Sequence, residues 1–296
     1  MQGPIIGVEL PKNTNFASLD ATLGQIADEG FDVVEISLDA FPLIVGGRIC
    51  QPWVDVLAEV LPKYPLAYTA HIGQGLDLRD MNEARLHRSV LLSSLEICHQ
   101  LGMDVLVVHY EVKSDDRRIE EHFLEAHRWA GDAAHKLGIR LCVENIEVEL
   151  IEPLVRFIED LAHPQVSLTL DTGHAYLASR YFNFDLLDAI ASMAPYLGHV
   201  HLNDNTGVFE ALRVTDRRAY DAMGMGYRRQ FGRGDIHLPP YYGSVPFDAI
   251  FSILHHYNGT YVCEYPHGDY GPLNRSIQET VRERIGASRA ARPESV

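Results

Sequence analysis

The stretch SLTLDTGHAY, residues 167–176, begins as a strand and ends with groups that a plain strand does not need. Successive side chains of a strand point to opposite faces, so Leu168 and Leu170 share one face and Asp171 lies on the other. The two leucines are suited to packing under helices. We therefore expect Asp171 to end a buried strand on the inner side of a sheet, close to His174.

Similar segments recur along the chain and alternate with helical patterns. The predicted strands are IIGVEL from Ile5, DVVEISL from Asp32, LAYTAHI from Leu66, DVLVVHY from Asp104, IRLCVENI from Ile139, VSLTLD from Val166, GHVHLND from Gly198 and TYVCEYP from Thr260. The predicted helices span residues 18–29, 52–61, 81–101, 119–137, 152–161, 186–193, 246–256 and 277–285.

This alternation predicts an α/β fold, a (β/α)8 TIM barrel in a single domain. The barrel covers residues 1–286, and residues 287–296 are expected to form a flexible tail. A doubly wound sheet with a second domain is the alternative. No change of composition marks a linker, so the barrel is preferred.

One connection is much longer than the others. Residues 205–243 separate the seventh predicted strand from the following helix, and loops of this length in compact domains are usually functional or disordered. Residues 205–234 contain six arginines and three acidic residues. One interpretation is a solvated surface excursion. The other is a lid in which Arg228 and Arg229 bind a phosphate or carboxylate of the substrate.

The composition argues against several classes of function. A formal net charge of −16 disfavours nucleic acid as a partner, because phosphate contacts require clustered lysine and arginine. No apolar run is long enough to span a membrane, and the N-terminus lacks the order of a secretory signal, so we expect a cytoplasmic protein without a membrane partner. The four cysteines lack CxxC spacing and are expected to be buried thiols. A homo-oligomer is compatible with the sequence.

The third to eighth predicted strands each end with a metal-binding type of side chain on the same face. These residues are His71, His109, Glu144, Asp171, His201 and Glu264. Active sites of (β/α)8 barrels lie at the carboxyl ends of the strands. Each residue alone has a structural explanation, such as a core histidine or a helix-capping aspartate. Six of them in one layer favour a functional site.

Electrostatics favours a metal ion in this layer. Two carboxylates about 4 Å apart at an effective dielectric of about 20 repel by roughly 4 kcal/mol. Glu144, Asp171 and Glu264 therefore require a cation if they converge. Carboxylates beside neutral imidazoles are typical ligands of divalent metals, and zinc or manganese is expected.

Five short motifs resemble the xylose isomerase-like superfamily, which includes sugar isomerases and epimerases, inosose dehydratase and endonuclease IV. The motifs are VEN from Val143, LDTGH from Leu170, HVHLND from His199, GDIHLP from Gly234 and CEYP from Cys263. In the isomerase and epimerase branch, the resemblance implies one divalent ion bound by Glu144, Asp171, His201 and Glu264. It also implies that Glu144 and Glu264 act as acid and base, while His174 contacts a substrate oxygen.

The endonuclease IV branch implies a larger set of ligands for three zinc ions. The matching residues are His71, His109 and Glu144 for one ion, Glu144, Asp171, His201 and Glu264 for another, and His174, Asp235 and His237 for the third. Two positions depart from the tagatose and psicose epimerases. Gly207 stands where they have an arginine, and Leu150 stands where they have a glutamate.

Three functional hypotheses follow from these residues. The first is a divalent-metal-dependent isomerase, epimerase or related lyase that acts on a small sugar or sugar-like polyhydroxy carbonyl compound by Glu-mediated proton transfer. The second is a multi-zinc hydrolase of a small phosphoester, and the third is a metal-stabilised binding protein. The acidic composition suits a small substrate and sugar chemistry dominates the resemblance, so the first is favoured.

Overall fold

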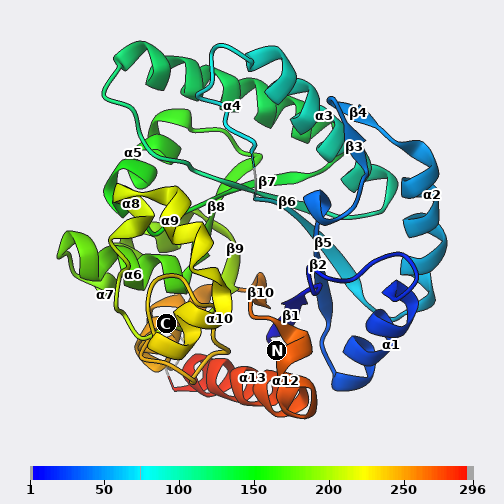
Figure 1. Ribbon diagram of the computed structural model, residues 1–296, viewed down its shortest axis with the longest axis vertical. Coiled ribbons are helices and arrows are strands. Elements are labelled where there is room, and N and C mark those ends of the chain that lie inside the picture. Colours follow the sequence, from blue (N-terminus) through cyan, green and yellow to red (C-terminus); the bar gives the residue numbers. More distant parts are fainter. Residues whose placement is uncertain (1–2, 74, 292–296) are drawn as a thin grey trace, which may run out of the picture.

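The apolar strand segments come together as a closed barrel of eight parallel strands (Figure 1). The computed structural model describes residues 3–73 and 75–291. The barrel strands are β1 (Ile5–Glu9), β2 (Val33–Ser37), β5 (Ala67–Ile72), β6 (Val105–His109), β7 (Arg140–Glu144), β8 (Val166–Asp171), β9 (Leu197–Leu202) and β10 (Thr260–Cys263). Their order is β1-β10-β9-β8-β7-β6-β5-β2, so the predicted (β/α)8 barrel is confirmed.

Side-chain parity holds along the barrel strands. Leu168 and Leu170 are fully buried in the main core with the helices. Side chains on the opposite face of the strands point into the barrel. Among them, Val107 and Cys142 belong to a small separate apolar cluster. The register pairs Asp171 with His201 across β8 and β9. Neighbouring strands therefore end at similar levels, and their inward side chains meet in one layer.

Helices cover the outside of the barrel (Figure 1). They are α1 (Leu19–Glu29), α2 (Gln51–Val60), α3 (Ala84–Gln100), α4 (Arg117–Leu137), α5 (Ile151–Leu161), α6 (Thr172–Phe182), α7 (Leu186–Met193), α11 (Phe247–Ile253), α12 (His267–Tyr270) and α13 (Asn274–Ala290). The eight predicted helices are all present, within a few residues. Helix α6, which begins at Thr172, and the short helix α12 were not predicted. A short hairpin of β3 (Ile44–Val45) and β4 (Arg48–Ile49) was also not predicted.

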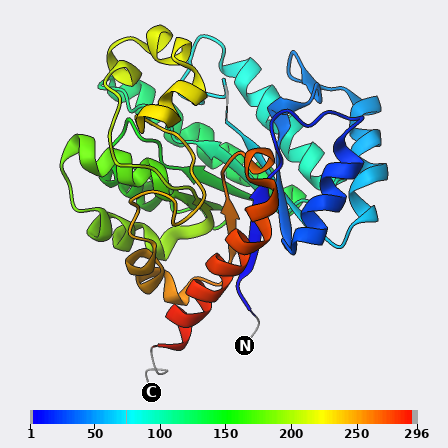
Figure 2. The ribbon, with the colours of Figure 1, turned by 60° about the horizontal axis from the view of Figure 1, so that its bottom comes forward.

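The last helix packs on the outside of the barrel beside the first strand. Helix α13 passes β1 (Figure 2). Its Arg282 donates hydrogen bonds to the Pro4 carbonyl at 2.7 Å and to Asp32 at 2.9 Å. The helix continues to Ala290, so it includes the first residues of the segment that we expected to be a tail. Residues 292–296 of that segment lie outside the described residues.

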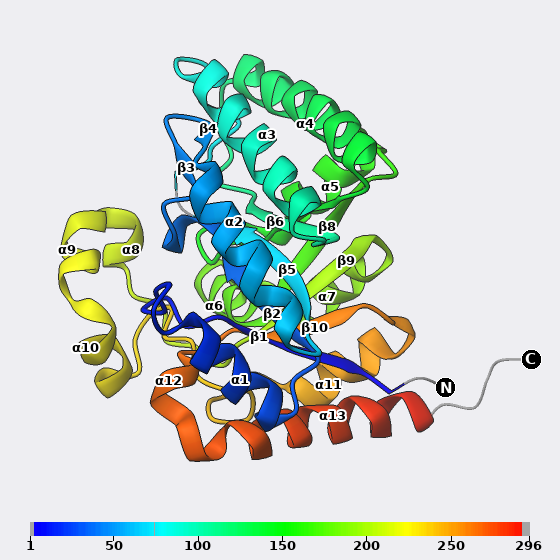
Figure 3. The ribbon, with the colours of Figure 1, turned by 90° about the vertical axis from the view of Figure 1, so that its right-hand side faces the viewer.

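The long connection after β9 is folded rather than irregular. It contains α8 (Leu212–Thr215), α9 (Arg217–Ala222) and α10 (Gly224–Phe231). These helices stand out from the carboxyl end of the barrel (Figure 3). A bridge between Asp204 and Leu238 joins the two ends of the segment. The insertion is therefore anchored beside the mouth of the barrel.

Cys98, Cys142 and Cys263 are buried thiols as expected, but Cys50 is partly exposed because it lies at the start of α2. Among residues 3–73 and 75–291, no helix has the length and apolar character needed to cross a bilayer.

A buried histidine in α4 makes stability depend on pH. His127 is 1% exposed, lies against the rings of Phe123 and Phe157, and donates from Nδ1 to the Phe123 carbonyl at 3.0 Å. Burial lowers the pKa of His127 to about 4. An unfolded histidine has a pKa of about 6.5, so below that pH the unfolded chain binds a proton that the folded chain does not. This contribution to stability is complete above pH 6.5 and is lost as the pH falls towards 4.

We expect His127→Leu to weaken this dependence. From pH 7 to pH 5, the free energy of unfolding of the wild type should fall by about 2 kcal/mol more than that of the variant. Urea denaturation of both proteins across this range measures the difference. Parallel curves would show that His127 does not titrate differently in the folded and unfolded states.

Candidate metal centre

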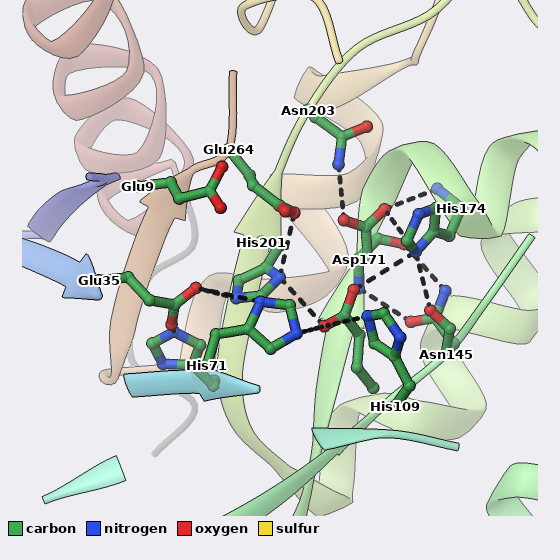
Figure 4. Close-up of polar contacts among 12 residues, drawn as sticks. Glu9, Glu35, His71, His109, Asn145, Asp171, His174, His201, Asn203 and Glu264 are labelled. Atoms are coloured by element: carbon green, nitrogen blue, oxygen red, sulfur yellow. Dashed lines mark hydrogen bonds and ion pairs between the residues drawn. The ribbon is translucent and has the colours of Figure 1, made fainter. Parts of the chain in front are cut away.

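The structure brings together all nine side chains that the sequence predicts as metal ligands. Figure 4 labels His71, His109, Asp171, His174, His201 and Glu264 among them. The nine side chains form three groups, in each of which the candidate ligand atoms lie within 4.8 Å of one another. The groups are His71, His109 and Glu144; Glu144, Asp171, His201 and Glu264; and His174, Asp235 and His237. Glu144 belongs to two groups, so the first two are contiguous.

The central group has the spacing of a shared metal ion. His201 Nδ1 lies 3.4 Å from Glu144 Oε2 and 3.3 Å from Glu264 Oε2. Two ligand atoms of a tetrahedral zinc ion with bonds of about 2.1 Å are roughly 3.4 Å apart. Glu144, Asp171 and His201 are 0% exposed and Glu264 is 3% exposed. The contacts are therefore longer than good hydrogen bonds and occur where water cannot compensate them.

Asp171 also begins helix α6. Its Oδ1 accepts a hydrogen bond from the His174 backbone at 2.6 Å, and its Oδ2 accepts one from Asn203 Nδ2 at 2.6 Å. Asn145 holds the Asp171 backbone through two further hydrogen bonds. The capping role and the place in the central group therefore hold together, because Asn145 and Asn203 fix the orientation of this carboxylate.

The first side group shares an oxygen with the central group. His71 Nε2 lies 3.4 Å and His109 Nε2 lies 3.8 Å from Glu144 Oε2. Burial lowers the pKa of His71 to about 4, which keeps the ring neutral and able to coordinate. This group also has the longer spacing expected of ligands around a cation.

The third group is held more tightly by direct hydrogen bonding. His237 Nε2 lies 2.9 Å from Asp235 Oδ2, and His174 Nε2 lies 3.5 Å from the same oxygen. His237 Nδ1 donates to the Glu264 carbonyl at 3.0 Å. The Asp235 carboxylate is thus already paired with an imidazole, unlike the carboxylates of the central group.

The concentration of carboxylates shifts the ionisation of the whole centre. Burial raises the pKa of Asp171 to about 8, and Glu264 and Glu144 add to the effect. Burial would also raise the pKa of Glu144, but His201 and His174 outweigh it and hold this pKa well below its ordinary value. Burial would lower the pKa of His237, but Asp235 and Glu264 raise it to about 10. Positive charge in the centre, on imidazoles or on a bound cation, therefore stabilises its ionised carboxylates.

The donor atoms of the centre fit a divalent cation. Among the described residues, both Glu144 oxygens, Glu264 Oε2, His201 Nδ1 and His71 Nε2 are buried without a hydrogen-bond partner. Unpaired buried polar atoms are costly, and these converge on one region. Carboxylate oxygens with imidazole nitrogens are a donor set that zinc and manganese accept.

Two buried acids on the first and second strands were not predicted. Glu9 ends β1, accepts a hydrogen bond from Ser37 Oγ at 3.0 Å and lies 3.3 Å from Lys12. Burial raises the pKa of Glu9 to about 6, although Lys12 opposes this. Glu35, in the middle of β2, is 0% exposed. Each of these acids interrupts an apolar run, IIGVEL or DVVEISL, and such a charge within a predicted strand could have indicated them.

The insertion arginines contact the chain around the third group. Arg228 Nη1 donates to the Asp235 carbonyl at 2.8 Å and also contacts Tyr220. Arg229 donates to the Ile236 carbonyl at 3.1 Å and pairs with Asp269 at 2.8 Å. Both guanidinium groups therefore anchor α10 to residues 235–236. Their predicted role in substrate binding stays a prediction.

The fold and the centre define a (β/α)8 barrel with a buried carboxylate and imidazole cluster at the carboxyl ends of its strands. Residues 23–286 match the family model of the xylose isomerase-like TIM barrel. The chain therefore belongs to this family. No curated protein sequence matches it.

Solved structures share the fold over nearly their whole length. A D-tagatose 3-epimerase-like protein is 18% identical with a TM-score of 0.72, covering 95% of this chain and 98% of its own. A xylose isomerase-like TIM barrel protein from Mycobacterium smegmatis, in complex with magnesium, is 18% identical with a TM-score of 0.70, covering 97% and 98%. The 3-keto-D-glucoside 4-epimerase of E. coli is 17% identical with a TM-score of 0.67, covering 95% and 99%. At these identities the likeness establishes the fold.

Proposed function

We propose that this chain is a divalent-metal-dependent isomerase or epimerase, or a related lyase, of a small sugar or sugar-like polyhydroxy carbonyl compound. One observation carries the proposal. The carboxylates of Glu144 and Glu264 come from β7 and from the end of β10, which are not neighbours in the barrel, and approach the same nitrogen of His201. Two acids facing each other across a cation site are suited to moving a proton on either side of a substrate carbon.

Each residue of the central group has a role in this chemistry. Glu144, Asp171, His201 and Glu264 would hold the ion, with zinc or manganese expected. When bound, such an ion polarises a carbonyl oxygen and makes the neighbouring C–H more acidic. Glu264 or Glu144 removes that proton and the other carboxyl group returns one. The His174 ring lies between the central and the third group. From this place it would contact and orient a substrate oxygen.

The similar structures support the same class of reaction. Several are described as sugar epimerases, including an L-ribulose 3-epimerase and a D-psicose 3-epimerase with D-tagatose. Another is a magnesium complex. They favour a small carbohydrate substrate and a divalent cation in this chain, while the substrate itself depends on the insertion and the rim of the barrel.

The proposal predicts exchange of a carbon-bound hydrogen with solvent. The metal-loaded protein should be incubated in deuterium oxide with a panel of ketoses, sugar phosphates and inososes, followed by NMR and mass spectrometry. We expect deuterium at a carbon next to the carbonyl in a product that is an isomer or a dehydration product. Turnover without any exchange of a carbon-bound hydrogen would contradict proton abstraction.

The side groups favour a second candidate, a multi-zinc hydrolase of a small phosphoester. His71 and His109 extend the central group with metal-like spacing, and Arg228 and Arg229 lie near the third group. The 2.9 Å hydrogen bond of His237 to Asp235 argues against three ions, because that contact must open for both to bind a metal. Two results together would favour the hydrolase: the protein releases inorganic phosphate from small phosphoesters, and it binds about three zinc ions per chain.

A further inference from the structure

Glu35 is a buried carboxylate that lies behind the central group. It belongs to β2 and is 0% exposed. Its Oε1 lies 2.8 Å from His201 Nε2, and its Oε2 lies 2.9 Å from His199 Nε2. Thr69 Oγ1 donates to Oε2 at 3.2 Å. Glu35 therefore faces the side of the His201 ring opposite to the nitrogen that approaches Glu144 and Glu264 (Figure 4).

These contacts are too short for an ion between Glu35 and the two histidines. Ligand atoms that share a zinc ion stand roughly 3.4 Å apart, whereas both nitrogens lie within 2.9 Å of a Glu35 oxygen. The His199 contact is a hydrogen bond. His201 Nε2 lies equally close to Oε1, but its N–H direction is not aligned well enough for a hydrogen bond. Glu35 is thus a partner of imidazole N–H groups rather than a ligand.

This arrangement determines which nitrogen of His201 is free. An ionised carboxylate only accepts hydrogen bonds, so the nitrogen facing it carries the proton. A neutral imidazole has one N–H, and a proton on Nε2 leaves the Nδ1 lone pair directed at the central group. Carboxylates that fix the ring of a ligating histidine in this way also increase its basicity.

We propose that Glu35 is a positioning residue that holds His201 in the Nε2–H tautomer, so that Nδ1 binds the divalent cation. The inference rests on the proposed function, because it requires a cation in the central group. His199 takes the second oxygen and thereby fixes the carboxylate against rotation. The proposal also explains a charge with no solvent contact inside a barrel, where an unpaired carboxylate would be strongly disfavoured.

Glu35→Gln tests the inference with little change of size. The amide has one acceptor oxygen and one NH2 donor, so it cannot accept from both histidines. A neutral amide oxygen facing His201 is a weaker acceptor than a carboxylate and lowers the basicity of the ring, whereas an NH2 group facing His201 moves its proton to Nδ1, so either orientation weakens the ligand. We expect the affinity for Zn²⁺, measured by competition with a chelator, to fall about 10–100-fold.

Glu29→Gln is the matched control. Glu29 is a second buried glutamate beside a histidine, His267, and also accepts a hydrogen bond from Asn274 at 3.1 Å. It lies on α1, outside the three ligand groups. This variant should be less stable than the wild type, yet bind Zn²⁺ with unchanged affinity. The comparison separates a loss of buried pairing from a loss of ligand geometry.

A spectroscopic measurement on the wild type covers the case in which Glu35→Gln does not fold. Long-range 15N–1H correlation spectra of the Zn²⁺-loaded protein, assigned with a His201 variant, should show a proton on Nε2 of His201. A proton on Nδ1 instead would overturn the inference, as would a Glu35→Gln variant with the affinity of the wild type. A wild type that binds no divalent ion would overturn the proposed function together with it. A wild type that binds Zn²⁺ with the proton on Nε2 of His201, but has no epimerase activity, would support the Glu35 inference and contradict the proposed function.

Discussion

Glu264→Gln is expected to lower turnover by about 10²–10⁴-fold while the fold is retained. Glu264 is 3% exposed and follows β10, and its backbone N–H donates to the Leu202 carbonyl at 2.9 Å. Glutamine keeps the size of the side chain and a carbonyl oxygen for the cation. It cannot take up or release a proton on the substrate carbon, so the chemical step loses its acid or base.

Glu9→Gln is the control that shows whether the loss of turnover is specific to Glu264. Glu9 is another buried carboxylate at the rim, drawn beside Glu264 in Figure 4, but it is outside the central group. The same substitution there should have a much smaller effect on kcat. Metal content and thermal unfolding should be measured for both variants. A Glu264→Gln enzyme with full metal content and a near-normal kcat would remove this residue from the proton transfer.

Gly173→Ala is expected to lower the free energy of unfolding by about 3 kcal/mol or more, because an added methyl group collides inside the centre. A Cβ at this position would lie 1.7 Å from Asn203 Oδ1 and 2.8 Å from its Cγ. Asn203 would have to move, and its 2.6 Å hydrogen bond to Asp171 Oδ2 would be lost. A buried carboxylate left without this partner adds to the cost. Metal affinity should fall with stability, since Asp171 loses its fixed orientation.

Gly286→Ala is the matched control, for which we expect an increase in stability instead of a decrease. Gly286 lies in α13, and a Cβ there would meet no atom within 4 Å. Alanine should stabilise this helix by up to about 1 kcal/mol through its higher helix propensity. Chemical denaturation and Zn²⁺ competition measure both variants. Equal stabilities for the two would show that Gly173 is not confined by Asn203.

The barrel and the convergence of the candidate ligands were predictable because the two-residue period of a strand is fixed by its geometry. A period of two residues places Asp171, His201 and Glu264 on inner faces, whatever the rest of the chain does. The parallel order of the strands then brings these ends to one side. The same reasoning applied to β2 would have included Glu35, whose alternation with Val34 and Ile36 follows the same rule.

Other parts of the site depend on contacts that no local pattern records. Asn203 meets Asp171 across 32 positions of sequence, and its amide has no periodic signature. No local pattern marks Thr172 as the start of a helix, which follows from the cap that Asp171 provides. The guanidinium groups of Arg228 and Arg229 suggested anion binding, whereas their backbone acceptors are determined only by the folding of the insertion.

The central claim is that Glu144, Asp171, His201 and Glu264 together bind a divalent cation. Its most direct test is elemental analysis of the purified protein, followed by titration of the chelator-treated protein with Zn²⁺, Mn²⁺ and Mg²⁺. The account predicts at least one tightly bound ion per chain, a higher thermal midpoint on reloading, and loss of that ion in Asp171→Ala. A wild type that is free of metal, and whose thermal midpoint does not respond to any of the three ions, would contradict it.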